Sequence, residues 1–252
     1  MRKIGNILLI AIFVGLTLHM LVCAYYYFST KDLILAIENE DTFKVEQLLK
    51  EGTDPNMLKV PASKFWTFLE YSPDCPLSIA CKTGNFEIVE MLVTHGAKVE
   101  PPAEAGFTPL QATLLYYQPD DPEIVSFLLK NGAKTEWPQN EKAAVSAARM
   151  RPCVYDKTKA NGTVFSSEYD ESTAIGITKI VGMLCDLTDI DVETSTALLT
   201  ASVQQENLFL TRYLLTKGCD PTKADANGKK PLDYAAETNN TELIRILIEA
   251  YE

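Results

Sequence analysis

The feature that most constrains the fold is a segment that recurs along the chain. Leu214 and Leu247 lie 33 residues apart in matching apolar contexts, and Gly96 and Gly132 lie 36 apart. Each copy is therefore one small unit of secondary structure that cannot bury its apolar face alone. We expect neighbouring units to stack and to bury a continuous core between them, as in a solenoid.

The residues of each copy follow one pattern. The clearest copy opens with Cys75-Pro-Leu-Ser-Ile-Ala, has Gly84 between two predicted helices, and ends at Gly96-Ala97. This pattern resembles the ankyrin repeat, with its T-P-L-H-x-A opening and its glycine turn after the second helix. The resemblance implies an all-α solenoid of about six helix-turn-helix units over residues 31–252. The apolar run before it predicts one N-terminal hydrophobic helix. The units lie near 31–56, 75–100, 106–136, 141–190, 196–222 and 227–252.

Local signals mark where the helices begin and end. Prolines fit the first helical turn, where the missing N–H costs nothing, at Pro76, Pro109 and Pro231. Glycines with a left-handed conformation are expected after the second helices, at Gly52, Gly96, Gly132 and Gly218. The side chains of Thr108 and Thr196 are predicted to cap helix starts.

The insertion 57–74 lies where the ankyrin resemblance places β-hairpin fingers, which commonly contact partners. It contains aromatic and basic residues of the kind found at interface hot spots, namely Lys59, Lys64, Phe65, Trp66, Phe68 and Tyr71. We expect these residues to bind a partner. The alternative is that the aromatic side chains fold back and cover the solenoid.

Two further insertions interrupt the repeats. Tyr116 and Tyr117 begin a short one, which is either a partner contact or a solvated turn, given the Pro and Asp that follow. The longer one covers about residues 151–172 and ends in acidic residues. A loop of this length is either a recognition loop or a disordered excursion, and the sequence does not choose between them.

We expect the N-terminal residues 1–28 to form a signal-anchor or a cleaved signal peptide. Arg2 and Lys3 precede an apolar run from Ile4 to Phe28, long enough to cross a bilayer. The positive-inside rule then predicts a single-pass inner-membrane protein with periplasmic repeats, and after cleavage a secreted or periplasmic one. The combination of a short anchor with repeats suggests a bacterial protein.

The remaining residues supply no recognisable chemistry. The net charge of −11 disfavours nucleic-acid binding, and there is no C-x-x-C pair for zinc or redox chemistry. Acidic residues between positions 186 and 193 are spaced loosely like calcium ligands, but a solvated turn explains them. Cys81 and Cys185 fit apolar helix faces as small hydrophobic residues, and Cys153 is the best position for a reactive thiol. The disulfide state of Cys75, Cys81, Cys153, Cys185 and Cys219 stays open.

We therefore expect no enzyme activity, no cofactor and no metal. The first hypothesis is a membrane-tethered ankyrin adaptor that is monomeric without its protein partner and holds that partner on its concave surface and fingers. The second is an immunity or inhibitor protein that neutralises a toxin or hydrolase of the cell envelope, whose basic surface the acidic chain would complement. The third is an envelope protein that supports defence against oxidative stress.

Overall fold

A computed structural model of the protein describes residues 31–57, 74–101, 107–115, 121–137, 142–150, 153–155, 165–187 and 190–251. The predicted N-terminal hydrophobic helix lies outside these residues, as does nearly all of the insertion 57–74. Residues 31–38 are helical. The helices that follow are α2 (Thr42–Lys50), α3 (Pro76–Thr83), α4 (Phe86–Thr94), α5 (Pro109–Leu115), α6 (Asp121–Lys130), α7 (Ala143–Ala148), α8 (Glu171–Leu187), α9 (Val192–Gln204), α10 (Leu208–Thr216), α11 (Pro231–Thr238) and α12 (Thr241–Glu249).

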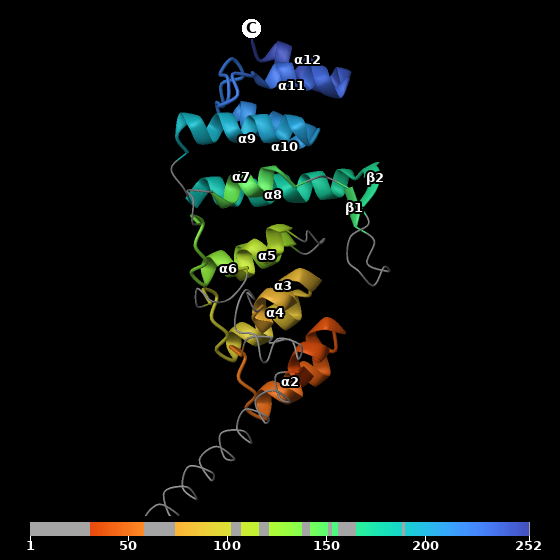
Figure 1. The fold of residues 1–252 in the computed structure, drawn as a ribbon, viewed down its shortest axis with the longest axis vertical. Coiled ribbons are helices and arrows are strands. Elements are labelled where there is room, and N and C mark those ends of the chain that lie inside the picture. The colour runs from red at the N-terminus through yellow and green to blue at the C-terminus, as the bar shows by residue number, and fades with distance from the viewer. Residues whose placement is uncertain are drawn as a thin grey trace, which may run out of the picture.

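The helices form consecutive pairs that stack along the long axis of the molecule, with the C-terminus at one end (Figure 1). The main apolar core extends from Leu33 to Leu214, and a smaller cluster that includes Val203 and Leu247 holds the last pair. Five of the six residues of α7 are buried alanines or valine, so its backbone packs closely against α8 and α9. The predicted α-helical solenoid is confirmed.

The turns after the second helices have the expected backbone conformation. Gly52, Gly96, Gly132 and Gly218 have φ values between +88° and +91°, where a side chain would be strained. The three prolines occupy first helical positions. The hydroxyl of Thr108 accepts a hydrogen bond from the backbone N–H of Gln111 at 3.2 Å, as a cap should.

The predicted cap at Thr196 is wrong. The helix begins earlier, because Asp191 caps it by accepting a hydrogen bond from the backbone N–H of Thr194 at 2.6 Å. Thr196 is buried inside α9, where its hydroxyl donates to the carbonyl of Val192. A carboxylate is favoured at a helix N-terminus by the helix dipole as well as by its hydrogen bonds.

The insertion 151–172 contains a short antiparallel sheet that the sequence did not predict. Strand β1 (Cys153–Tyr155) pairs with β2 (Phe165–Tyr169), and Cys153 lies opposite Tyr169. After the sheet, Asp170 accepts hydrogen bonds from Ser172 and Thr173 and starts α8 at Glu171. These bonds lower the pKa of Asp170, chiefly through the side chain of Thr173. The sheet projects from one end of α8 in Figure 1.

The predicted single-pass inner-membrane location, with periplasmic repeats, is contradicted. Among the described residues, no helix is both long enough and apolar enough to cross a bilayer. The longest, α8, has 17 residues and carries charged side chains on one face, whereas a membrane span needs about 20 apolar residues. The apolar run 4–28, on which the prediction rested, lies outside the described residues.

Candidate functional site

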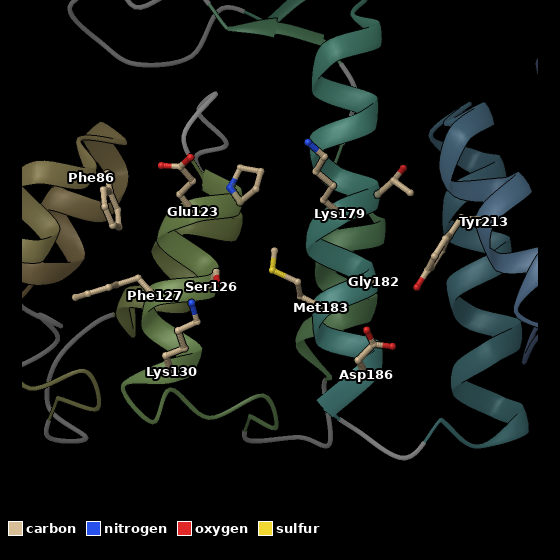
Figure 2. Close-up of a pocket in the computed structure, with 12 residues that line it drawn as sticks. Phe86, Glu123, Ser126, Phe127, Lys130, Lys179, Gly182, Met183, Asp186 and Tyr213 are labelled. Carbon is tan, nitrogen blue, oxygen red and sulfur yellow. The ribbon is translucent and has the colours of Figure 1, made fainter.

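A groove of about 770 Å³ crosses the face formed by the second helices of four successive pairs. Its walls come from α4, α6, α8 and α10, so residues far apart in the sequence meet there (Figure 2). The lining residues are Phe86, Pro122, Glu123, Ser126, Phe127, Lys130, Thr178, Lys179, Gly182, Met183, Asp186 and Tyr213.

Helical periodicity places these residues on one side of each helix. In α6, positions 123, 126, 127 and 130 line the groove, whereas Ile124, Val125 and Leu128 are buried in the core. Spacings of three and four residues keep side chains on one face of a helix. In α8 the lining positions 179, 182, 183 and 186 repeat the same spacing. The two helices therefore present matching stripes to the groove.

Large apolar side chains form the floor of the groove. Phe86 and Phe127 meet edge to face, with ring centroids 5.5 Å apart and planes at 90°, an arrangement that aromatic quadrupoles favour. Phe127, Met183 and Tyr213 are each half-buried. Apolar surface that remains partly open to water favours a partner that covers it.

The lining includes two small residues, one on α6 and one on α8. Ser126 and Gly182 occupy the same place in the two stripes, next to Phe127 and Met183. A Cβ atom on Gly182 would lie 3.1 Å from the hydroxyl oxygen of Tyr213. Gly182 therefore lets the ring of Tyr213 lie against α8 from the neighbouring pair.

Four charged side chains flank this floor at its two ends. Glu123 of α6 and Lys179 of α8 lie at one end, and Lys130 and Asp186 lie at the other (Figure 2). All four are exposed. Within the described part of the chain, Asp186 alone among them has an ion-pair partner, Lys217, at 3.7 Å. An exposed pair of this length contributes little to stability, so the four charges remain available to a partner.

Lys217 borders the groove beside Tyr213. Its ammonium lies 5.4 Å from the centre of the Tyr213 ring, a cation–π contact. The pKa of Lys217 is raised, first by its contact with Tyr213 and then by the charge of Asp186. A positive charge is therefore held at the edge of the groove throughout the physiological pH range.

The predicted partner-binding residues lie outside the described residues. This applies to Lys59, Lys64, Phe65, Trp66, Phe68 and Tyr71 of the insertion 57–74, and to Tyr116 and Tyr117. The role of these residues in partner binding stays a prediction.

One of the acidic residues considered for calcium binding, Asp191, has other partners in the structure. Asp191 caps α9, and its carboxylate lies 3.3 Å from the ammonium of Lys142. The pKa of Asp191 is lowered to about 2, first by its hydrogen bonds with Thr194 and then by Lys142. In the part of the chain that the structure describes, no three His, Cys, Asp or Glu side chains gather in a way that could hold a metal ion.

Four cysteines have described side chains, and all four are free thiols. Cys75 and Cys81 are buried, and burial raises the pKa of Cys81 far above the ordinary range. Cys185 and Cys219 are half-buried, and burial raises the pKa of Cys185 to about 11. Cys81 and Cys185 thus behave as the small hydrophobic residues that their positions predicted. The side chain of Cys153 lies outside the described residues.

Two curated proteins are similar to this chain in sequence. Ankyrin repeat protein FPV022 of fowlpox virus (strain NVSL) is 26% identical over 235 residues, which cover 87% of this chain and 36% of that protein. The E3 ubiquitin-protein ligase KEG of Arabidopsis thaliana is 26% identical over 212 residues, which cover 70% of this chain and 12% of that protein. The chain therefore spans about a third or less of the length of these relatives.

Solved structures share the fold. The human ASB11 ankyrin repeat domain superposes with a TM-score of 0.60 at 18% identity, covering 86% of this chain and 82% of that domain. A chain of the complex between the predatory endopeptidase Bd0816 of Bdellovibrio bacteriovorus and immunity protein Bd3460 superposes with a TM-score of 0.58. Its identity is 20%, and the match covers 87% of this chain and 97% of that one.

The strongest link to a family comes from the repeat itself. The family model described as ankyrin repeats (3 copies) matches residues 33–137 and 174–252, which together are well over half of the chain. The unmatched stretch between them holds α7 and the short sheet of the insertion. With the stacked helix pairs and their glycine turns, this match shows that the chain belongs to the ankyrin-repeat family.

Proposed function

We propose that this chain is a non-catalytic protein-binding module whose groove across the second helices receives part of a partner protein. The observation that carries the proposal is the row of half-buried large side chains, Phe127, Met183 and Tyr213, along an open groove. Aromatic residues and methionine are enriched at protein interfaces, and a few such anchors contribute most of the binding free energy. The ankyrin repeats support the same general role.

The shape of the groove supports a protein partner over a small molecule. Its lining comes from four helices in four successive pairs, so it extends across the stack rather than into it. Small-molecule sites are usually enclosed and bury most of their ligand. A shallow groove with an apolar floor and charged ends has instead the composition of an interface, which has an apolar centre and a polar rim.

A second candidate function is an inhibitor or immunity protein for a hydrolase. It is supported by the likeness in fold to a chain of the endopeptidase–immunity complex, since the match covers 97% of that chain. The net charge of −11 would also steer this protein toward a basic enzyme. An adaptor would hold its partner with the partner's activity intact, whereas an inhibitor would abolish it.

A pair of matched variants tests where the partner binds. Ser126→Arg fills the groove, whereas Ser195→Arg places the same side chain on α9, a first helix, at a position of similar burial. We expect cross-linking capture of a reproducible partner by the wild type and by Ser195→Arg, and its loss in Ser126→Arg. Capture that survives Ser126→Arg and is lost in Ser195→Arg would refute the groove as the binding site.

The captured partner then separates the two functions. If it is a hydrolase, its activity is measured with the purified chain added in equimolar amount. Full inhibition would favour the inhibitor, and unchanged activity the adaptor. Thermal unfolding of both arginine variants, followed by circular dichroism, verifies that the loss of capture does not come from loss of the fold.

A further inference from the structure

The two stripes that border the groove are copies of one pattern with the charges exchanged. On α6 the order is acidic, small, large apolar and basic, at positions 123, 126, 127 and 130. On α8 the order is basic, small, large apolar and acidic, at positions 179, 182, 183 and 186. The four charges therefore alternate in sign around the floor, both along each helix and across the groove (Figure 2).

The charges of each stripe are seven residues apart, which is about 10 Å along a helix, or two turns. A second helix lying in the groove would present its own side chains at the same interval. Its apolar ridge would cover Phe127 and Met183, and the residues that flank the ridge would meet the four charges. Docking an amphipathic helix into an apolar groove is a common mode of recognition.

We infer that the partner inserts an amphipathic helix with charged residues on both sides of its apolar ridge. These charges alternate in sign so that each one is opposite to the nearest charge of the groove. The flank that faces α6 carries a basic residue near Glu123 and an acidic residue near Lys130. The flank that faces α8 carries an acidic residue near Lys179 and a basic residue near Asp186. This inference rests on the proposed function, because it assigns the chemistry of the partner to the same groove.

An alternating pattern of four charges has a consequence that makes the inference testable. When the inserted helix is reversed end for end, its two ends change places and so do its two flanks. Each charge therefore takes the position of a charge of the same sign, and the pattern of signs is unchanged. A complementary helix is therefore complementary in either direction, and a helix with the opposite signs is repelled in either direction. A wrongly charged ligand cannot recover its affinity by reversing its orientation.

Two synthetic peptides of identical composition test this. Each is about 20 residues long, so that it can be helical alone, and each has a leucine ridge flanked by two lysines and two glutamates. In the matched peptide the signs complement the groove, and in the exchanged peptide lysine and glutamate change places. Binding to the full chain is measured by fluorescence anisotropy at low and high salt.

We expect the matched peptide to bind about tenfold more tightly at low salt, because four exposed charge pairs change from attraction to repulsion. Salt should reduce this difference. In the variant Glu123→Lys/Lys130→Glu/Lys179→Glu/Asp186→Lys, whose net charge is unchanged, the preference should invert. Circular dichroism of this variant verifies that it folds.

Equal binding of the two peptides, or no binding of either, would overturn the inference. Loss of natural partner capture in Ser126→Arg would still support the groove as a binding site in that case, so the two failures can be told apart. Sedimentation of the full chain addresses a different occupant. A dimer that Lys179→Glu dissociates would mean that a second copy of this chain covers the groove, which would also overturn the inference.

Discussion

Asn207 is expected to hold two neighbouring repeats together. Its side chain is fully buried, and it caps α10 by accepting a hydrogen bond from the backbone N–H of Leu210 at 3.0 Å. Its amide nitrogen also donates to the carbonyl of Ala174 on α8, at 3.3 Å. Asn85 makes the same cap bond on α4, to the backbone N–H of Ile88 at 3.2 Å. It therefore serves as a matched control.

Replacing each asparagine by alanine separates the two contributions. Loss of a cap costs about 1 kcal/mol, and loss of a buried hydrogen bond costs about 1 kcal/mol more. The carbonyl of Ala174 still accepts from the hydroxyl of Thr178 at 2.8 Å, so no further penalty for an unsatisfied group is expected. Asn207→Ala should thus lower the free energy of unfolding by about 2 kcal/mol, and Asn85→Ala by about 1 kcal/mol.

Urea unfolding followed by circular dichroism measures both variants, with unchanged m-values as a sign that the folded state is intact. Asn207→Ser, which keeps an oxygen for the cap but cannot reach Ala174, should lose about 1 kcal/mol. Equal losses for Asn207→Ala and Asn85→Ala would show that the bond to Ala174 contributes nothing. The reasoning from inter-repeat contacts would then be refuted.

Three further predictions concern ionisation and the groove. The native pKa of Asp191 is about 2, below its unfolded value of about 4, so its stabilising contribution is present above pH 4 and is lost as the pH falls toward 2. Asp191→Asn, which keeps the cap, should flatten this part of the stability profile in urea titrations, and an unchanged slope would contradict the assignment. Burial raises the pKa of Cys81 and Cys185, so mass spectrometry should show slow alkylation of both in the folded chain at about pH 8 and rapid alkylation in denaturant. Gly182→Ala should raise the free energy of unfolding by about 0.5 kcal/mol, because a gain in helix propensity of about 1 kcal/mol exceeds the cost of shifting the Tyr213 hydroxyl. A loss of stability in urea would mean that this ring is fixed in place.

The positions of the turns follow from the sequence because they depend on local backbone energetics. Glycine is the residue that adopts a positive φ without strain, so Gly96 and Gly132 mark turns wherever the chain packs. Glycine alone, however, predicts only some of the residues that have a positive φ. Glu40, Glu206 and Asn239 also have φ values near +55°, at the turns between the helices of their pairs. There the packing of both helices imposes the conformation on Glu40 and Glu206, whereas asparagine adopts it more readily than most residues.

The start of α9 shows how packing overrides a local signal. Threonine is a good cap, so the sequence predicts a helix start at position 196. The structure instead begins the helix at Val192, because Asp191 provides a better cap and Thr194 and Thr196 are buried in α9. Burial of a hydroxyl is acceptable there because it bonds to a carbonyl one turn earlier.

The sequence by itself determined the repeat, the fold and the family, because period, helical spacing and turn residues are local properties that each copy carries. The sequence also contains the two stripes at 123–130 and 179–186, and their equal spacing and exchanged charges are visible in the amino-acid sequence. Only the tertiary structure decided that these stripes border one groove and that Phe86 and Tyr213 complete its floor. The sheet between β1 and β2 was likewise fixed by pairing across the insertion. Such contacts join segments far apart in the chain, so they depend on how the helix pairs stack, which no single repeat specifies.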